Sequence, residues 1–179
     1  MTGNGKTNEQ VLWEKISQIK VAMLVSVTPE GGYHSRPMMT AQNDFDGRLY
    51  FFTSKTSPKV DEVLNEPKVL LNYSGPDDSV YVSVYGNAKV VTDPVKIDEH
   101  WSPALNAFFK EGRNDPLICL MEIEVEKAEY WDSSQSKMTQ IYEMVKSSFT
   151  DEKPNLGEHK VMNLVKKGHS KDENDKFRR

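Results

Sequence analysis

The chain has a single cysteine and no long apolar run, which argues against a disulfide-rich protein and against a membrane-spanning one. Its 179 residues include one cysteine, Cys119, so an internal disulfide framework is excluded. Cys119 lies within the apolar run LICLMEI, which predicts a buried thiol rather than a nucleophile. No apolar run approaches the roughly 20 residues that span a bilayer, and the N-terminus has neither a basic nor an apolar signal region. We therefore predict a cytoplasmic protein without a membrane partner.

The usual catalytic and metal-binding motifs are also missing. The sequence contains no nucleophile elbow, P-loop or dinucleotide fingerprint. Its four histidines lie far apart and lack metal-ligand spacing, so we expect surface side chains and no metal site: His34, His100, His159 and His169. No catalytic residue can be named from motifs alone.

Negative charge exceeds positive charge outside the C-terminal end. Residues 160–179 hold seven Lys and Arg against three Asp and Glu, a net charge of +4, whereas the whole chain carries −4 and the remainder therefore −8. A basic tail can bind nucleic acid, but this one lacks the interleaved aromatic residues of a stacking surface and follows an acidic body. We predict a solvated, disordered tail and no nucleic-acid partner.

The stretch from Tyr33 to Lys59 is the most informative part of the chain. Its alternating apolar residues predict two strands, and the Asp46-Gly47 pair between them is typical of a hairpin turn. Ser57 then has the position of a helix N-cap and Pro58 that of the first helical residue. This order predicts a hairpin that leads directly into a helix.

Lys59 lies in the first turn of that helix, where its charge faces the positive end of the helix dipole and is mildly unfavourable. An anion bound at this place would make the position of the lysine favourable. The hydroxyl and ammonium groups nearby would form a phosphate cradle: Thr53, Ser54, Lys55, Ser57 and Lys59. The alternative is an ordinary helix start with a solvated lysine. Spacing alone leaves both interpretations open.

Further strands and helices follow from hydrophobic periodicity. We predict a helix over residues 7–20 capped by Thr7 or Asn8, and strands over 21–28, 69–73, 79–91 and 117–131 besides the two hairpin strands. Gly86 predicts a bend or bulge in the 79–91 strand, and helical pieces are expected over 93–101 and 103–109. In the last strand, the evenly spaced Glu122, Glu124 and Glu126 predict a solvated face.

Six strands in meander order, with helices only at the start and between strands, predict a mainly β fold: a six-stranded antiparallel split β-barrel with flanking helices. The expected organisation is a flexible N-terminus over 1–7, the barrel over 8–132, an extension over 133–164 that packs on the barrel, and the disordered tail over 165–179. Within the extension, residues 138–149 have the pattern of an amphipathic helix.

Aromatic residues gather around the candidate phosphate cradle in this fold: Tyr33, Phe52, Tyr73, Tyr81, Tyr85 and Trp131. A flat aromatic cofactor with a phosphate tail suits such a set. Packing of the barrel is the alternative interpretation of the same residues.

Several motifs, taken together and in order, resemble the FMN-binding split barrels of the pyridoxamine 5'-phosphate oxidase-like superfamily. They are HSRPM at 34–38, LYFFTSKTSPKVDEV at 49–63, VSVYGNAKVV at 82–91 and AEYWD at 128–132. LGEHKVMNL at 156–164 is similar to the ending of the general stress protein branch. The resemblance covers about residues 8–164.

The resemblance implies a homodimer that binds FMN, with FAD as the alternative, at the subunit interface. Position by position, it places Arg36, Pro37 and Met38 beside the flavin ring and ribityl chain. It assigns the phosphate to the segment that holds Phe52, Thr53, Ser57 and Lys59, and it brings Trp131 against the flavin.

The sequence departs from true pyridoxamine 5'-phosphate oxidases where those bind their substrate. Lys137-Met138-Thr139 stands where an Arg-apolar-His triplet is expected, and Pro58 replaces a second basic residue. We therefore expect an FMN-dependent oxidoreductase of another small molecule, with a donor such as NAD(P)H. The alternatives are a flavin carrier or sensor without turnover, or a split barrel that uses deazaflavin or haem.

Overall fold

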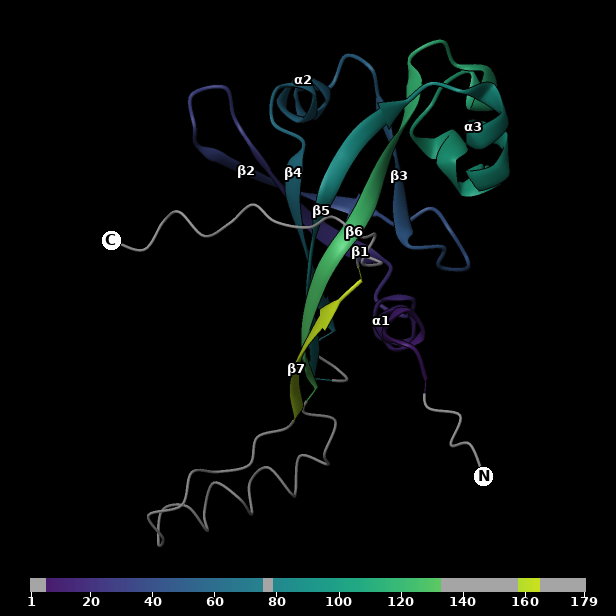
Figure 1. Cartoon of the computed structure of the whole chain (residues 1–179). Helices are drawn as coiled ribbons and strands as arrows, with labels where there is room; N and C mark the ends of the chain where they lie inside the picture. The colour runs from purple at the N-terminus through teal and green to yellow at the C-terminus, as the bar shows by residue number, and fades with distance from the viewer. Residues whose placement is uncertain (1–5, 76–78, 133–157, 165–179) are drawn as a thin grey trace, which may run out of the picture.

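The computed structural model describes residues 6–75, 79–132 and 158–164. A strongly twisted antiparallel sheet forms the body, with α1 beside it and α3 at one end (Figure 1). Strands cover β1 Val21–Val27, β2 Tyr33–Met39, β3 Arg48–Ser54, β4 Lys68–Gly75, β5 Val80–Val91, β6 Ile118–Asp132 and β7 Glu158–Asn163. Helices cover α1 Asn8–Ile16, α2 Pro58–Asn65 and α3 Pro94–His100, with short 3-10 turns η1 Pro103–Ala107 and η2 Gly112–Asn114.

The sheet has the predicted antiparallel β architecture, with seven strands rather than six. The strand order is β2-β1-β4-β5-β6-β3, and β7 pairs with the second half of β6. The expected simple meander is therefore wrong, because β3 leaves its sequence neighbours to pair with the first half of β6. β7 comes from the stretch that resembles the ending of general stress proteins.

The predicted hairpin between β2 and β3 is also wrong, and the error locates the site. β2 pairs with β1 and β3 with β6, so the two strands end the sheet path; among the described residues an isolated bridge between Thr40 and Phe51 connects them. Gly47 has φ +93°, and the Asp46 carboxylate accepts the Arg48 N–H, so the dipeptide does form a turn. However, the segment between β2 and β3 is too long for a two-residue hairpin loop.

Local signals for helix starts and bends are confirmed. Thr7 caps α1 in a reciprocal capping box with Gln10. The β5–β6 register shifts at Gly86, where an added Cβ would lie 2.2 Å from the Glu124 carbonyl oxygen. Only glycine fits there, and the bulge bends the strand as predicted. α1 ends at Ile16, earlier than predicted, and Lys20 has φ +62° just before β1 begins.

Two apolar clusters hold the fold. The larger one fills the inside of the sheet and includes Leu12 and Ile16 of α1. The smaller one packs α3 and the following turns against β3 and β6: Tyr50, Ile97, Phe109, Ile118 and Leu120. α3 and η1 are thereby fixed beside the free edge of β3. Burial of such side chains is the main source of stability.

Some predicted segments lie outside the described residues: the flexible N-terminus up to residue 5, the helix over 138–149 and the basic tail over 165–179. Within the described part of the chain, none of the helices has the length and apolar character needed to cross a bilayer.

Candidate functional site

The phosphate cradle predicted from sequence gathers around Lys59. Its ammonium donates hydrogen bonds to Thr53 Oγ1 at 3.0 Å and to Ser57 Oγ at 2.7 Å. Ser57 is the N-cap of α2 and Pro58 the first helical residue, as predicted, but the Ser57 hydroxyl makes no capping hydrogen bond. Among the described residues, no carboxylate lies within salt-bridge distance of Lys59. The hydroxyls are therefore its neutral partners.

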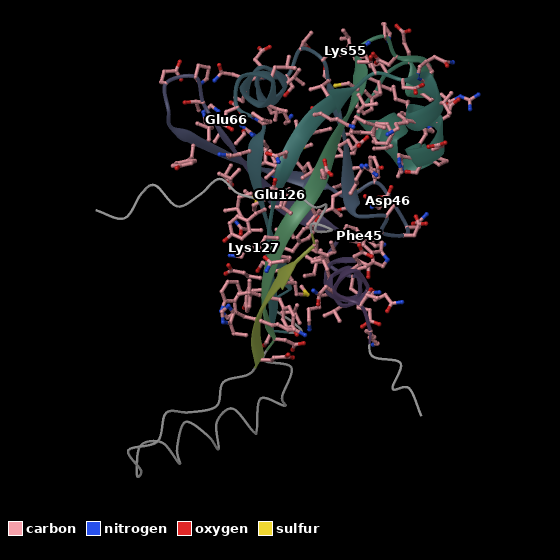
Figure 2. The ribbon with its side chains drawn as sticks, in the orientation of Figure 1. Phe45, Asp46, Lys55, Glu66, Glu126 and Lys127 are labelled. Carbon is pink, nitrogen blue, oxygen red and sulfur yellow. The ribbon has the colours of Figure 1, made fainter. Side chains whose placement is uncertain are left out.

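The electrostatics of Lys59 favour an anion. Burial lowers the pKa of Lys59, and the nearby Arg36 guanidinium lowers it further. The nearby Glu62 carboxylate opposes these effects but does not outweigh them, so additional negative charge would be favourable here. A phosphate group would supply it, so these side chains fit the phosphate of the implied cofactor. Lys55 does not join them, because its ammonium donates to the Pro116 carbonyl at 2.7 Å at the upper end of the sheet (Figure 2).

Arg36 forms an ion pair with a buried carboxylate, that of Glu62. Its two terminal nitrogens donate to Ser26 Oγ at 2.5 Å and Glu62 Oε2 at 2.6 Å, and His34 Nδ1 lies 2.6 Å from Glu62 Oε1. Glu62 is only 3% exposed and comes from α2, so the network ties α2 to β1 and β2. The guanidinium nitrogens still carry further donors that can face a ligand.

The charge state of this network follows from its contacts. Burial alone would raise the pKa of Glu62, but hydrogen bonds from Ser26, His34 and Arg36 outweigh burial and hold this pKa below its ordinary value. Glu62 is therefore ionised at neutral pH and compensates Arg36. Sequence reasoning predicted His34 as a surface residue; it is exposed, yet it contacts Glu62. Glu62 itself was missed, since nothing in the helix pattern predicts that a glutamate is buried.

A cavity of about 450 Å³ opens between the free edges of β2 and β3, and we name it the β2–β3 cavity. Four predicted site residues line it: Pro37, Met38, Phe52 and Thr53. The other lining residues come mainly from β1, β2 and the η1 region: Val21, Met39, Ser54, Leu105, Phe108 and Phe109. These largely apolar walls fit a planar aromatic group, and Thr53 connects the cavity to Lys59.

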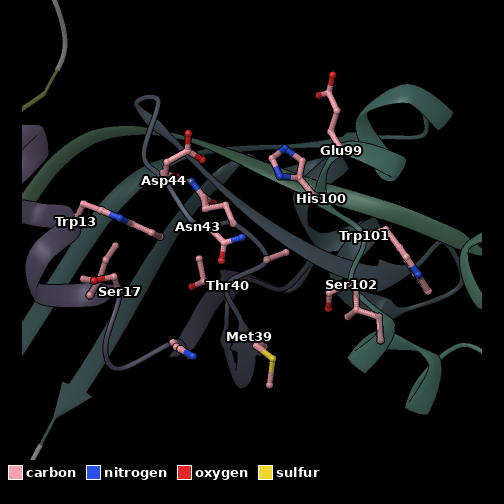
Figure 3. A pocket seen from close by; sticks show the side chains of 15 residues that line it. Trp13, Ser17, Met39, Thr40, Asn43, Asp44, Glu99, His100, Trp101 and Ser102 are labelled. Carbon is pink, nitrogen blue, oxygen red and sulfur yellow. Dashed lines mark hydrogen bonds between the residues drawn. The ribbon is translucent and has the colours of Figure 1, made fainter.

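A second, larger cavity of about 540 Å³ lies between α1, the segment after β2 and the end of α3; we name it the α1–α3 cavity (Figure 3). It shares Met39 and Leu105 with the β2–β3 cavity. Sequence reasoning did not single it out, because its walls come from three separate stretches. The cation and hydroxyls that suit a phosphate adjoin the smaller cavity, which is therefore the better cofactor site.

Trp131 lies apart from the other predicted site residues. It stands opposite Tyr81 on β5, and its ring stacks on His159 of β7 at 4.9 Å. Thr53 pairs with Cys119, which precedes Trp131 by twelve residues on β6. Strand geometry separates these two positions by roughly 35 to 40 Å along the strand. One chain therefore does not bring Trp131 to the cavity that holds Thr53.

Glu122 corrects another prediction. It is the first of three evenly spaced glutamates assigned to a solvated face, yet it is 1% exposed. Three cations surround it: Arg48 Nε at 2.9 Å, Lys89 Nζ at 2.9 Å and Lys96 Nζ at 2.7 Å. Hydrogen bonds from Lys96 and Lys89 outweigh the effect of burial and lower the pKa of Glu122. α3 covers this carboxylate, which strand alternation does not predict.

Comparisons with known proteins show which family the sequence and the fold resemble. The family model for pyridoxamine 5'-phosphate oxidase-like proteins matches residues 7–155. A candidate general stress protein 26 from Jannaschia sp. CCS1 is 26% identical, with a TM-score of 0.68 over 84% of this chain and 94% of its own. The general stress FMN/FAD binding protein of Xanthomonas citri is 25% identical, with a TM-score of 0.63 over 72% and 90%.

A relative from a fungus extends the similarity beyond bacteria. Protein bli-3 of Neurospora crassa is 24% identical over 141 residues, which are 73% of this chain and 68% of the fungal protein. The family model spans most of the sequence, from α1 to beyond β6. The chain belongs to the pyridoxamine 5'-phosphate oxidase-like family.

Proposed function

We propose that this chain binds FMN, with the phosphate at Lys59 and the ring in the β2–β3 cavity. The observation that carries the proposal is the Lys59 ammonium, which is held by Thr53 and Ser57 beside Arg36 and has no carboxylate partner among the described residues. A phosphate would neutralise the Lys59 ammonium, bind the same hydroxyls and lie near Arg36, whose charge Glu62 already compensates. The similarity to the Xanthomonas citri protein, described as FMN/FAD binding, supports a flavin.

Pro37, Met38 and Phe52 would hold the ring. They line the apolar part of the cavity, where water is displaced and a planar aromatic group gains contact. β2 ends the sheet path, so one edge of its backbone lacks a partner among the described strands and can hydrogen-bond a ligand. FAD is the alternative, and mass spectrometry of the released cofactor would distinguish the two.

We further propose a homodimer, in which Trp131 of each subunit contacts the flavin held by the other. Exposed apolar side chains on β1, β5, β6 and β7 support it: Val21, Met23, Tyr81, Trp131 and Val161. Such a face on a sheet is typical of an interface. A second copy would also overcome the separation between Trp131 and the cavity.

Hybrid dimers test this arrangement. Lys59→Met and Trp131→Ala chains, each expected to bind flavin poorly or with an altered spectrum, would be co-expressed with different tags and purified as a mixed dimer. If each site combines Lys59 of one subunit with Trp131 of the other, the hybrid recovers one normal flavin site per dimer. Two impaired sites would contradict the exchange, and a monomer in light scattering would contradict the dimer.

We propose that the protein is a cytoplasmic flavin-dependent oxidoreductase acting on a small molecule, with NAD(P)H as the electron donor. Bound FMN supplies hydride and electron transfer, so no protein nucleophile is required. The chain's own residues bind and orient the cofactor and keep water from the apolar cavity. Because Lys137-Met138-Thr139 replaces the expected substrate-binding triplet, we do not assign pyridoxamine phosphate as its substrate.

A carrier or sensor without turnover is the second candidate. The observation that favours it is the lining of the β2–β3 cavity, whose polar side chains are limited, in the part that the structure describes, to the hydroxyls of Thr53 and Ser54. Steady-state oxidation of NADH or NADPH with an electron acceptor distinguishes the two. An oxidoreductase exceeds the rate of free FMN, whereas a carrier does not.

The experiment that tests the proposal first is a visible absorption spectrum of the protein, taken as purified and after incubation with FMN and removal of the unbound fraction. We expect a retained flavin spectrum close to one FMN per subunit. A deazaflavin or haem spectrum, or no retained chromophore, would contradict FMN binding.

A further inference from the structure

The α1–α3 cavity adjoins the proposed flavin site and contains polar groups without a protein hydrogen-bond partner among the described residues. Met39 and Leu105 line both cavities, so a molecule in the larger one would lie next to a ring in the smaller one. Trp13, whose ring stacks on Phe45 with 6.4 Å between centroids, forms the wall on the α1 side. Figure 3 shows Asn43, Asp44 and His100 gathered across from it. The cavity therefore combines a planar aromatic wall with a polar cluster.

The polar cluster has unused hydrogen-bonding capacity. Within the described part of the chain, the Asn43 amide, the Asp44 carboxylate and the His100 ring nitrogens make no hydrogen bond with protein, although the Asp44 backbone carbonyl accepts one from Gln42. The His100 ring is instead fixed by stacking on Tyr50 at 4.0 Å. An amide, a carboxylate and an imidazole together can accept and donate, so they suit a ligand with N–H or amide groups.

Carboxylates outnumber ammonium groups in the lining of the cavity. Its lining includes the carboxylates of Asp44 and Glu99 and a single ammonium, that of Lys20. Glu99 points away from the centre, whereas Asp44 lies within the polar cluster (Figure 3). The Lys59 site differs, because among the described residues the Lys59 ammonium has no carboxylate within salt-bridge distance. The α1–α3 cavity therefore has a carboxylate in its polar cluster, whereas the β2–β3 cavity adjoins the Lys59 ammonium.

We propose that the α1–α3 cavity binds a planar nitrogen heterocycle that is uncharged or carries one positive charge, and that it discriminates against anionic analogues. The aromatic wall would stack on the ring, and Asn43, Asp44 and His100 would bind its polar substituents. The inference rests on the proposed function, since it takes the neighbouring cavity as the flavin site and names the class of the second reactant.

Three probes of nearly equal size isolate the effect of charge: nicotinate, nicotinamide and 1-methylnicotinamide. Each would be titrated calorimetrically into the full chain, with and without FMN. With a close carboxylate partly screened by solvent, we expect 1-methylnicotinamide to bind at least about fivefold more tightly than nicotinate. Asp44→Asn should bring this ratio close to one, whereas Glu30→Gln, which removes an exposed carboxylate outside the cavity, should leave it unchanged.

Three outcomes would overturn the inference: nicotinate binding as tightly as 1-methylnicotinamide, a ratio that survives in Asp44→Asn, or no binding of any probe at millimolar concentration. Flavin retention is scored separately from its absorption spectrum. A protein that retains FMN but fails the probe test leaves the proposed function standing. A protein that shows the charge preference without retaining FMN keeps the binding site and overturns the flavin proposal.

Discussion

Two buried glutamates, Glu62 and Glu122, carry a negative charge that is compensated by different sets of cations. Both are at most 3% exposed, and in both cases hydrogen bonds overcome burial and lower the pKa. Glu62 has one permanently charged partner, Arg36, together with His34. Glu122 is surrounded by three cations from β3, β5 and α3. One permanent cation thus compensates the charge of Glu62, whereas three cations share the compensation of Glu122.

The difference reflects two roles: Glu62 supports the proposed flavin site, whereas Glu122 stabilises the packing of α3 on the sheet. Arg36 lies beside Lys59 in the proposed flavin site, so Glu62 couples the position of that guanidinium to the folding of α2 onto β1 and β2. The cations around Glu122 lie outside both lining sets and instead fix α3 against the sheet. A substitution at the first should change stability and flavin binding together; one at the second should change stability alone.

The largest effect is expected for Arg36→Met. It leaves Glu62 buried without its permanent cation, and breaking a buried pair in this way typically costs about 3 to 5 kcal/mol of unfolding free energy. Urea unfolding at pH 7 would measure the loss. A change below about 1 kcal/mol, as for an exposed pair, would show that Glu62 does not depend on Arg36.

Adding Glu62→Gln to Arg36→Met sharpens the comparison. The double variant removes the uncompensated charge, so we expect it to regain about half or more of the lost stability. Flavin affinity should stay low, because the guanidinium is still missing. Recovery of FMN binding along with stability would mean that Arg36 acts on the fold and has no contact with the cofactor.

Glu122→Gln should cost about 1 to 3 kcal/mol, since three cations lose a buried charged partner. FMN retention should not change. Glu124→Gln is the matched control on the same strand, and its exposed side chain predicts a change within about 0.5 kcal/mol. Loss of flavin in Glu122→Gln at temperatures where the variant is folded would contradict a role of Glu122 in stability alone.

Acid should weaken the protein through both carboxylates. Because their pKa values are lowered in the folded chain, the unfolded chain takes up protons first, so their stabilisation is complete above the ordinary glutamate pKa of about 4.3 and is lost as the pH falls through the folded value. Unfolding free energies from pH 7 down to acid should therefore fall less steeply in Glu122→Gln than in the parent. Equal slopes would contradict the linkage.

The smallest effect is expected for Lys89→Met. Arg48 and Lys96 still compensate Glu122, and Lys89 is well exposed, so the change should stay below about 1 kcal/mol. Thermal unfolding would measure it. A loss as large as that of Arg36→Met would show that the three cations are not interchangeable.

Features with local causes were predictable from the sequence. The cap of α1, expected at Thr7 or Asn8, the irregularity at Gly86 and the start of α2 at Pro58 each depend on a few neighbouring residues. The proximity of Thr53, Ser57 and Lys59 also followed from spacing alone, because all lie at one strand-to-helix connection.

Features set by distant partners were not predictable. Pairing of β3 with β6 overrides the Asp46-Gly47 hairpin signal, because β6 offers a long apolar partner strand. Burial of Glu122 depends on α3 folding over it, and nothing in the alternation of β6 distinguishes it from its exposed neighbours. The separation of Trp131 from the cavity likewise needs the strand order.

The central claim is that Lys59 and its hydroxyl partners bind the flavin phosphate, and comparing FMN with riboflavin tests it most directly. Fluorescence titration of both into the parent, Lys59→Met and the control Lys55→Met isolates the phosphate. A charged hydrogen bond predicts about 10- to 100-fold tighter binding of FMN by the parent and by Lys55→Met. Lys59→Met should lose most of this preference while its affinity for riboflavin stays the same. Equal affinity of the parent for both flavins, or an unchanged preference in Lys59→Met, would contradict the account.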